Sequence, residues 1–339
     1  MRLIKTEDAV GHVLCHDMTQ IIKDQYKDAR FRKGHVVTEE DIPVLLSMGK
    51  EHLYVWEMTP GMVHENDAAE RLLALCGQEN MIRSGVKEGK IELKAACDGV
   101  FLVDSARLVA VNSQDEVMIA TRKGGMAVRE GDKLAGMRVI PLIIEEEKLR
   151  KAEQAAGDKP LLSLKPYVRK TACIVATGGE VKKGLIKDTF TPVVIDKLKT
   201  YGIETLEVVY SGDGVENVRD AVLAMREKKP DMILCTGGMS VDPDDNTPGG
   251  IKAAGANIIA YGAPVLPGAM FLLGYFDDGM PVMGLPGCVM YAGATVFDLV
   301  LPKIAADVPV TRADLAALGE GGLCLGCKPC YYPICPFGK

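Results

Sequence analysis

The chain lacks both a long apolar run and a strongly basic segment, and each absence excludes a class of protein. No stretch approaches the roughly 18 apolar residues that a membrane-spanning helix needs, and the first residues lack the apolar core of a signal peptide. The formal net charge is −6, and Lys and Arg form only short runs. A nucleic-acid partner would require a clustered basic face. We therefore expect a cytoplasmic protein that binds neither a membrane nor nucleic acid.

The chain has enough apolar sequence for an ample core, because hydrophobic residues make up 47% of its 339 residues and charged residues 25%. This profile is typical of a soluble globular protein, and the length suits two domains. Composition shifts divide the chain into four parts: a mixed N-terminal region of helices followed by a small β-rich module (1–145), a charged linker (146–167), an α/β domain (168–310) and a Cys-rich tail (311–339). Within the β-rich module, the stretches Leu108–Val111 and Val117–Ala120 predict strands.

Apolar runs and helical patterns alternate along residues 168–310. Ala172–Ala176 is a continuous apolar run, as expected of a strand in a buried parallel sheet. Val218, Val222 and Met225 recur at helical spacing and predict one apolar helix face. We therefore predict an α/β fold with a doubly wound, mostly parallel sheet of about five strands.

Three glycine turns follow strand-like runs in this α/β part. They are Thr177–Glu180, Thr236–Met239 and Gly284–Gly287. In an open α/β sheet such turns gather at the carboxyl ends of the strands, where ligands bind. A glycine pair can also do no more than close a strand–helix connection, but three turns in one unit favour a ligand crevice.

An acidic cluster follows the second glycine turn. Asp242, Asp244 and Asp245 place three carboxylates within four residues, and Asp213 follows the second predicted strand. Clustered carboxylates suit a hard divalent cation, while glycine turns offer bare N–H groups to an anion. The alternatives are that Asp245 and Thr247 cap the next helix, and that Asp213 only forms a turn.

Several of these segments together resemble the molybdopterin-binding domain shared by molybdopterin adenylyltransferases and molybdopterin molybdenumtransferases. The likeness covers about residues 170–305. The segments that carry it are Thr236–Val241 with Asp245 and Thr247–Pro248 at their offsets, Val265–Gly268, Gly284–Gly287, Lys187–Thr189 and Asp213.

The resemblance implies a role in molybdenum cofactor biosynthesis. Its members bind molybdopterin, a pterin with a dithiolene and a terminal phosphate, or the adenylylated form, with Mg²⁺ and molybdate as further participants. By resemblance Asp245 and Asp213 would be catalytic and, together with Asp242, would hold the magnesium. The other implied ligand contacts lie on the glycine turns and neighbouring loops: Thr177, Gly178, Gly179, Asp188, Thr236, Gly237, Gly238, Ser240, Thr247, Pro267, Gly268, Leu285, Pro286 and Gly287.

The step that the resemblance favours is molybdenum insertion by a transferase. Two alternatives stay open, a molybdopterin adenylyltransferase and a non-catalytic carrier that delivers the cofactor to a molybdoenzyme. Cys288 and Val289 stand where the family usually has a polar pair, and Ala269 where it often has Lys. The missing polar pair favours the carrier, while Asp213 and Asp245 favour the enzyme. In either case we expect a small-molecule pterin ligand and a homo-oligomer.

The N-terminal part carries no matching catalytic segment. His64–Asp67 is its most polar stretch, and we expect a helix cap with solvated neighbours there.

Four of the ten cysteines crowd the tail as Cys324, Cys327, Cys330 and Cys335. Four thiolates at such short spacing predict a bound metal, either Zn²⁺ or an iron–sulfur cluster, and the spacing alone does not choose between them. A flexible thiol tail is the alternative.

Overall fold

The computed structural model describes residues 2–22, 26–55, 60–240, 242 and 245–339. The chain forms two compact units. The first comprises Met1–Ala96, Val103–Gly124 and Gly131–Ser163, and the second comprises Cys97–Leu102, Gly125–Glu130 and Leu164–Lys339. None of the helices in the described residues is long and apolar enough to span a membrane.

The first unit opens with short strands and one helix around a small core that includes Leu14, Leu45 and Leu53. Its elements are β1 (Arg2–Lys5), the 3-10 turn η1 (Thr6–Asp8), β2 (Met18–Ile22), β3 (Tyr26–Phe31), α1 (Asp41–Ser47) and β4 (His52–Val55). β1 pairs with β4, and β2 pairs with β3, both antiparallel. The Asp41 carboxylate accepts from Thr38 N at 2.8 Å and so fixes the start of α1.

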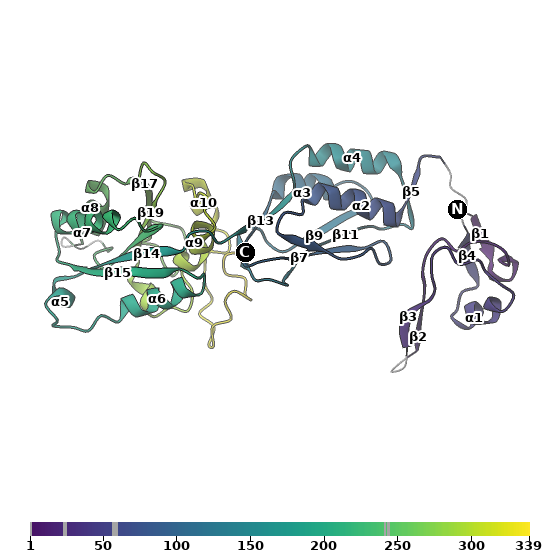
Figure 1. The fold of residues 1–339 in the computed structure, drawn as a ribbon, viewed down its shortest axis with the longest axis horizontal. Helices are drawn as coiled ribbons and strands as arrows, with labels where there is room; N and C mark the ends of the chain where they lie inside the picture. The colour runs from purple at the N-terminus through teal and green to yellow at the C-terminus, as the bar shows by residue number, and fades with distance from the viewer. Residues whose placement is uncertain (1, 23–25, 56–59, 241, 243–244) are drawn as a thin grey trace. The chain divides into compact units, whose positions relative to one another are not determined.

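The rest of the first unit is a four-stranded sheet, in the order β6-β7-β11-β9, with three helices on one face (Figure 1). The elements are β5 (Met62–His64), α2 (Glu65–Cys76), β6 (Met81–Arg83), β7 (Ile91–Ala95), α3 (Ser105–Asn112), β9 (Val117–Thr121), β11 (Lys133–Val139), β12 (Ile143–Glu145) and α4 (Glu146–Ala156). The predicted strand at Val117–Ala120 is therefore confirmed as β9.

The predicted strand at Leu108–Val111 is wrong, because these residues lie in α3. The Asp104 side chain accepts from Arg107 N at 3.1 Å and caps the helix. Val111 is buried while Val109 is 64% exposed. One apolar face is enough to hold this short segment as a helix, although its β-branched residues suggested a strand.

The Arg107 guanidinium joins α3 to the end of α4. Its Nε donates to Asp104 Oδ2 at 2.8 Å, and its two terminal nitrogens donate to the carbonyls of Ala156, Lys159 and Pro160. A planar fork with several donors can serve these acceptors at once, whereas an ammonium group cannot.

We expect Arg107→Ala to lower the free energy of unfolding of the first unit by about 2–3 kcal/mol, because three carbonyls lose a charged donor. Arg107→Lys should recover only part of that loss. Arg122→Ala removes an exposed pair with Asp132 and should cost about 1 kcal/mol or less. Urea denaturation of the three variants measures these differences, and equal losses for Arg107→Ala and Arg122→Ala would contradict the assignment.

The segment expected to be a linker, residues 146–167, contains a packed helix. α4 buries Leu149, Ala152 and Ala156 against the first unit, and the unit continues to Ser163. The many charged residues of this segment lie on the exposed face of α4, and they are the reason for the expectation of a linker.

The second unit is built on a six-stranded sheet in the order β15-β14-β16-β19-β18-β17. Its strands are β14 (Thr171–Thr177), β15 (Glu204–Ser211), β16 (Met232–Thr236), β17 (Asn257–Tyr261), β18 (Leu272–Tyr275) and β19 (Pro281–Leu285). The first four in sheet order run parallel, and β18 is antiparallel to both of its neighbours, β19 and β17. The predicted doubly wound, mostly parallel α/β fold is confirmed, with β18 as the strand that the prediction missed.

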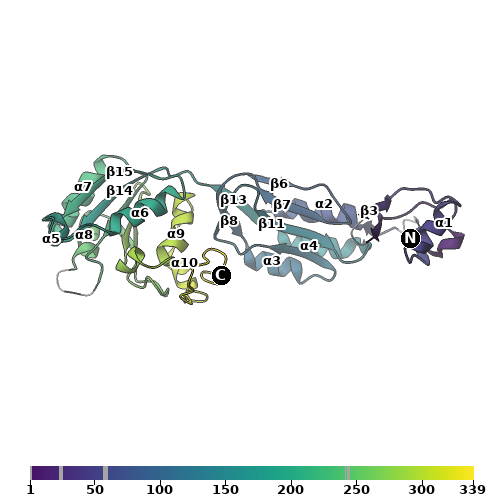
Figure 2. The same ribbon diagram turned by 90° about the horizontal axis from the view of Figure 1, so that it is seen from below.

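Helices cover both faces of this sheet, and Figure 2 shows β14 and β15 between α7 and α6. α6 and α9 pack Val194 and Phe297 into the core on one face, and α7 and α8 pack Val222 and Ile251 into the core on the other. The helices and 3-10 turn are α5 (Gly179–Lys182), α6 (Phe190–Lys199), α7 (Val215–Glu227), α8 (Thr247–Ala253), η2 (Gly287–Met290), α9 (Val296–Ala305) and α10 (Arg312–Ala317).

The second unit also contains a three-stranded sheet made from separate parts of the chain. Its order is β10 (Met126–Val128), β8 (Gly99–Val103) and β13 (Leu162–Pro166). The Tyr167 hydroxyl donates to Gly99 O at 2.8 Å and adds a further link across it. The second unit is therefore discontinuous in sequence.

Candidate functional site

Four strand–helix junctions of the second unit lie at one edge of its sheet. β15, β14, β16 and β19 are parallel neighbours, so their carboxyl ends at Ser211, Thr177, Thr236 and Leu285 share that edge. The chain leaves β14 towards β15 on one side and later returns to β16 on the other. The crevice between β14 and β16 is therefore the topological switch point, where open α/β sheets bind ligands.

The second glycine turn is fixed by two buried threonines from different elements. The Thr177 hydroxyl donates to Thr236 O at 3.0 Å, and the Thr247 hydroxyl donates to Gly237 O at 2.8 Å. The two hydroxyls lie 3.1 Å apart. Thr177 and Thr247 therefore hold the turn rather than offer free side chains to a ligand. The expected capping role of Thr247 is replaced by this bond, and Asn246 precedes the helix without a side-chain cap bond.

Glycine is required at this turn because the β14 backbone approaches closely. Gly237 has φ of +82°, and a Cβ placed there would lie 2.3 Å from Thr177 O. Gly238 has φ of +57°, and its Cβ would lie 2.6 Å from the Thr247 hydroxyl. The turn thus presents bare backbone at the switch point, which is the arrangement that anion-binding turns use.

Asp213 links the β15 junction to the first glycine turn. Its Oδ2 accepts from Gly179 N at 3.0 Å, and its side chain is exposed. Gly178 N also donates to Ser211 O at 3.2 Å. Asp213 therefore brings a carboxylate beside the β14 turn.

Lys182 places a positive charge at this edge, which the sequence motifs did not predict. A Cβ on Gly212 would lie 3.9 Å from its Nζ, which places the ammonium group beside the Asp213 loop. The only sequence signal was its position just after the first glycine turn.

The acidic loop is described only in part, because Val241, Pro243 and Asp244 lie outside the described residues. Asp245 N donates to Asp242 O at 2.9 Å, and Asp242 N donates to Asp245 Oδ2 at 3.4 Å. Burial and the Asp245 charge raise the pKa of the Tyr261 phenol, whose hydroxyl donates to Met239 O at 2.9 Å. Asp245 therefore faces the stretch that contains Ser240, which is itself exposed.

The helices that follow the acidic loop and the Asp213 loop, α8 and α7, pack against each other. A Cβ on Gly249 of α8 would lie 3.0 Å from Val215 Cγ2 of α7. Among the described residues, however, no three His, Cys, Asp or Glu side chains are gathered so as to hold a metal ion. Asp213, Asp242 and Asp245 thus supply carboxylates at one edge without forming a closed cage.

Asp188, predicted to contact the ligand, is bound to its own helix. Its Oδ1 accepts from Phe190 N at 2.9 Å and Thr191 N at 3.0 Å, and its Oδ2 accepts from the Tyr210 hydroxyl at 3.2 Å. Burial alone would raise the pKa of this carboxyl, but these hydrogen bonds outweigh it and lower the pKa. In the structure Asp188 caps α6.

The lowered pKa of Asp188 gives a pH-dependent expectation. Asp188→Ala should reduce the free energy of unfolding by about 1 kcal/mol at neutral pH through loss of the cap. Because the folded pKa lies below the unfolded value of about 3.9, the wild-type advantage is present above that pH and is lost as pH falls through the folded pKa. Urea denaturation between neutral pH and pH ~3 measures it. Asp196→Ala, at an exposed site, is the control, and a pH-independent difference for Asp188→Ala would contradict this role.

The two later loops meet the same edge from the β19 side. Leu285 and Pro286 are buried, while Gly287 is exposed at the start of η2. The Thr189 hydroxyl donates to Met290 Sδ at 3.1 Å and ties η2 to the loop before α6. Pro267 O accepts from Val296 N at 3.3 Å, and a Cβ on Gly268 would lie 2.7 Å from Val296 Cγ1. Of these loop residues, Gly287 is the one placed to present an N–H group.

His64 and Glu65 in the first unit are buried, so the expectation of solvated neighbours is wrong. Their exposed fractions are 2% and 7%. His64 Nδ1 accepts from Asn66 N at 3.1 Å, which makes His64 rather than Asn66 the cap of α2, and Nε2 lies 2.7 Å from Cys15 O. Burial lowers the pKa of His64 and raises that of Glu65. We therefore assign structural roles to the side chains of His64 and Glu65.

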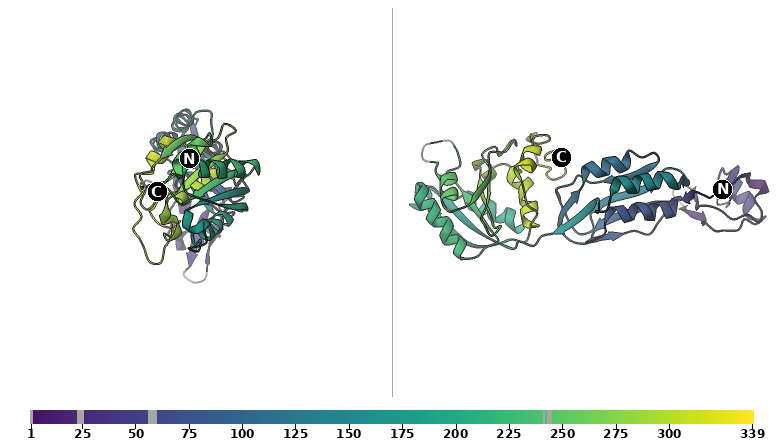
Figure 3. Two further views of the ribbon diagram at one scale, coloured as in Figure 1. Left: turned by 90° about the vertical axis from the view of Figure 1, so that its left-hand side faces the viewer. Right: turned by 90° about the horizontal axis from the view of Figure 1, so that it is seen from above.

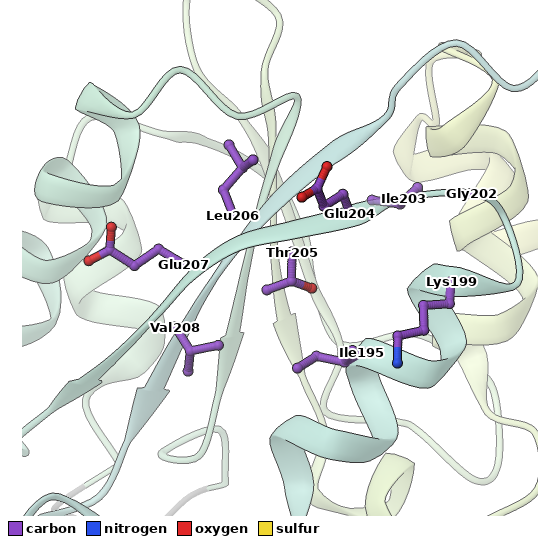
Figure 4. A pocket seen from close by; sticks show the side chains of 9 residues that line it. All are labelled: Ile195, Lys199, Gly202, Ile203, Glu204, Thr205, Leu206, Glu207 and Val208. Atoms are coloured by element: carbon purple, nitrogen blue, oxygen red, sulfur yellow. The ribbon is translucent and has the colours of Figure 1, made fainter.

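A cavity of about 630 Å³ lies away from the glycine turns, along the outer edge of β15. Thr205 and Val208 point towards α6, which carries Ile195 and Lys199 (Figure 4). These residues belong mainly to the amino-terminal half of β15, whereas the candidate site lies at its carboxyl end.

Comparison with known proteins finds matches in the part of the chain that carries this edge. Residues 173–306, within the second unit, match a family described as a probable molybdopterin binding domain. The match spans β14 to α9 and therefore includes every glycine turn described above. Residues 3–57 match a different family, described as a domain of unknown function (DUF8806).

A CinA-like protein of Mycobacterium tuberculosis (strain ATCC 25177 / H37Ra) is 33% identical over 76 residues. That match covers 22% of this chain and 18% of the relative, so the chain spans about a fifth of the length of the curated relatives it matches. A CinA-like protein of Petrotoga mobilis is 32% identical over 76 residues, with 22% of this chain and 19% of the relative covered.

The solved structures are more distant. The molybdopterin biosynthesis enzyme MoaB from Thermus thermophilus is 16% identical, with 42% of this chain and 99% of that chain covered and a TM-score of 0.36. A molybdenum cofactor biosynthesis protein from Pyrococcus furiosus is 13% identical, with 93% of this chain and 64% of that chain covered and a TM-score of 0.27.

Proposed function

We propose that this protein acts in molybdenum cofactor biosynthesis in the cytoplasm, where it binds molybdopterin or its adenylylated form with Mg²⁺ and promotes molybdenum insertion. The observation that carries the proposal is that four strand–helix junctions with three glycine turns share one sheet edge within the part of the chain that matches the molybdopterin-binding family. The switch point offers the backbone of the glycine turns, with the Asp213 carboxylate bonded to Gly179 N and the Lys182 ammonium beside the Asp213 loop. In this proposal Asp245 acts from the acidic loop that follows the second turn.

Charges of both signs at this edge fit a phosphorylated ligand and its counter-ion. The turns at Gly237, Gly238 and Gly287 supply backbone for phosphate or pterin oxygens, and the Lys182 ammonium adds positive charge. Mg²⁺ usually binds one or two carboxylates, several waters and substrate phosphates rather than a closed protein cage. The open set formed by Asp213, Asp242 and Asp245 suits that mode.

In this proposal these residues position the phosphate and neutralise its charge. When bound, Mg²⁺ would supply charge stabilisation at the phosphate. The glycine turns orient the phosphate, the carboxylates fix the ion, and Lys182 offsets charge on the leaving phosphate. Thr177 and Thr247 keep the turn rigid, so that its N–H groups need no reorganisation.

A carrier is the second candidate, and one observation favours it. Val289, which follows the Leu-Pro-Gly turn, is fully buried in the core, and burial raises the pKa of the half-buried Cys288 thiol. This loop therefore offers few polar side chains for chemistry. A carrier would bind the cofactor and pass it to a molybdoenzyme.

One experiment separates the candidates. The purified protein is incubated with adenylyl-molybdopterin, molybdate and Mg²⁺, and in parallel with molybdopterin, ATP and Mg²⁺. Mg²⁺-dependent AMP release with molybdenum bound to the pterin supports insertion. Pyrophosphate release from ATP supports adenylylation instead, and binding without either product supports the carrier. Absence of pterin binding in both mixtures would contradict the proposal.

A further inference from the structure

The four tail cysteines line one small cavity of the second unit. Cys324, Cys327, Cys330 and Cys335 all border a space of about 20 Å³. Figure 3 draws the tail in yellow beside the chain segment that forms α9. The spacing predicts that the four thiolates share a metal, and in the fold all four cysteines border this one cavity.

Hydrogen bonds and buried rings fix the tail at several places. Cys324 N donates to Leu266 O at 2.8 Å, and Leu266 N donates to Gly322 O at 2.8 Å. The Tyr332 hydroxyl donates to Asp298 O of α9 at 3.0 Å, and Phe337 is 2% exposed in the core. The path of the tail is thus set by protein contacts on both sides of the cysteines.

Between these fixed points the tail buries little apolar surface. Leu325, Tyr331 and Ile334 are 71%, 59% and 86% exposed, and Cys327 and Cys330 are exposed as well. Ordering the backbone of each residue costs about 1–2 kcal/mol, which exposed side chains do not offset. A cross-link among the cysteines would supply the missing stabilisation.

We propose that the four tail cysteines bind one Zn²⁺ ion as a structural site. Four thiolates in tetrahedral array are a preferred ligand set for zinc, and such sites contribute directly to folding free energy. A single water molecule needs roughly 10–15 Å³ of cavity volume, so this cavity has room for about one particle the size of a water molecule.

Zinc binding would require the four thiols to approach one another. Among the described residues no three potential ligands are gathered closely enough to hold a metal ion, and Zn–S bonds are about 2.3 Å long. Cys327 and Cys330 are exposed, while Cys324 and Cys335 are half-buried. In this proposal the exposed pair makes the larger adjustment.

The zinc site would brace two loops of the candidate ligand edge. Cys324 is bonded through its backbone to Leu266, directly before Pro267 and Gly268. Cys330 Sγ lies 2.8 Å from where a Cβ on Gly293 would stand, and Ala294 borders the cavity. This link to ligand binding rests on the proposed function, but the metal site itself does not.

The test is metal content of the full chain prepared under reducing conditions without chelator. We expect one zinc per chain, and substitution by Co²⁺ should give the intense visible bands of a tetrahedral thiolate complex. Cys327→Ser and Cys330→Ser should lose the zinc and the bands, because each removes one ligand. Cys97→Ser changes a half-buried cysteine outside the tail and should retain both.

A stability measurement keeps the test independent of pterin chemistry. Chelator should lower the thermal midpoint of the wild type and of Cys97→Ser, and leave Cys327→Ser unchanged, with circular dichroism confirming that each variant is folded. Absence of zinc and cobalt binding, or zinc content unaffected by the Cys327 and Cys330 substitutions, would overturn the proposal. Iron with acid-labile sulfide at the tail would also overturn it.

Discussion

Replacing Gly237 with Ala should lower the free energy of unfolding of the second unit by about 3 kcal/mol or more. Two effects add. A non-glycine residue at φ of +82° costs roughly 1–2 kcal/mol, and the new Cβ would stand 2.3 Å from the Thr177 carbonyl oxygen, a backbone atom of β14. Either the turn or the strand end must move to relieve that clash. Urea denaturation followed by circular dichroism measures the loss.

Gly255→Ala is the matched control for this change. Gly255 has φ of +92°, and a Cβ there would meet nothing within 4 Å, so only the backbone cost applies. Its expected loss is about 1 kcal/mol. Similar losses at the two positions would show that close approach of β14 is not what requires glycine at Gly237.

Replacing Asp245 with Asn should reduce Mg²⁺-dependent turnover on the order of 100-fold or more, because the metal loses a charged ligand worth several kcal/mol. Stability should change by less than about 0.5 kcal/mol, since Asp245 is only half-buried and its bond to Asp242 N is long at 3.4 Å. Turnover measured over a range of Mg²⁺ concentrations tests this. We expect the requirement for Mg²⁺ to rise as well.

Asp277→Asn is the control for charge alone. Asp277 is exposed after β18, at the opposite edge of the same sheet, and its substitution should leave turnover intact. Undiminished activity of Asp245→Asn would remove Asp245 from the metal site. It would leave the glycine turns as the remaining part of the proposed site.

The sequence predicted the α/β part well because its central strands are buried on both faces. Ala172–Ala176 and Met232–Cys235 are apolar throughout, and each ends at a glycine turn. β18 was missed because Leu272–Tyr275 is short and lies between turns. α3 was misread because its β-branched residues resemble a strand, while the Asp104 cap and the Arg107 contacts depend on tertiary structure.

The candidate site was predictable in its location but less so in its contacts. Strand ends fix where Asp213, Gly237 and Gly287 lie, since parallel neighbours share an edge. Spacing did not reveal that Thr177 and Thr247 bond to each other, or that Asp188 binds Tyr210. Those pairings join residues far apart in the chain, so only the folded structure determines them.

The discontinuity of the second unit has a practical consequence for fragments of this protein. A fragment that starts at residue 164 would contain the glycine turns and the tail but would lack β8 and β10. β13 would then be truncated and would have no neighbour, and the Tyr167 hydroxyl would lose its acceptor at Gly99. An unpaired strand edge of this kind invites self-association. The second unit is therefore best studied in the full chain, even when only its ligand chemistry is of interest.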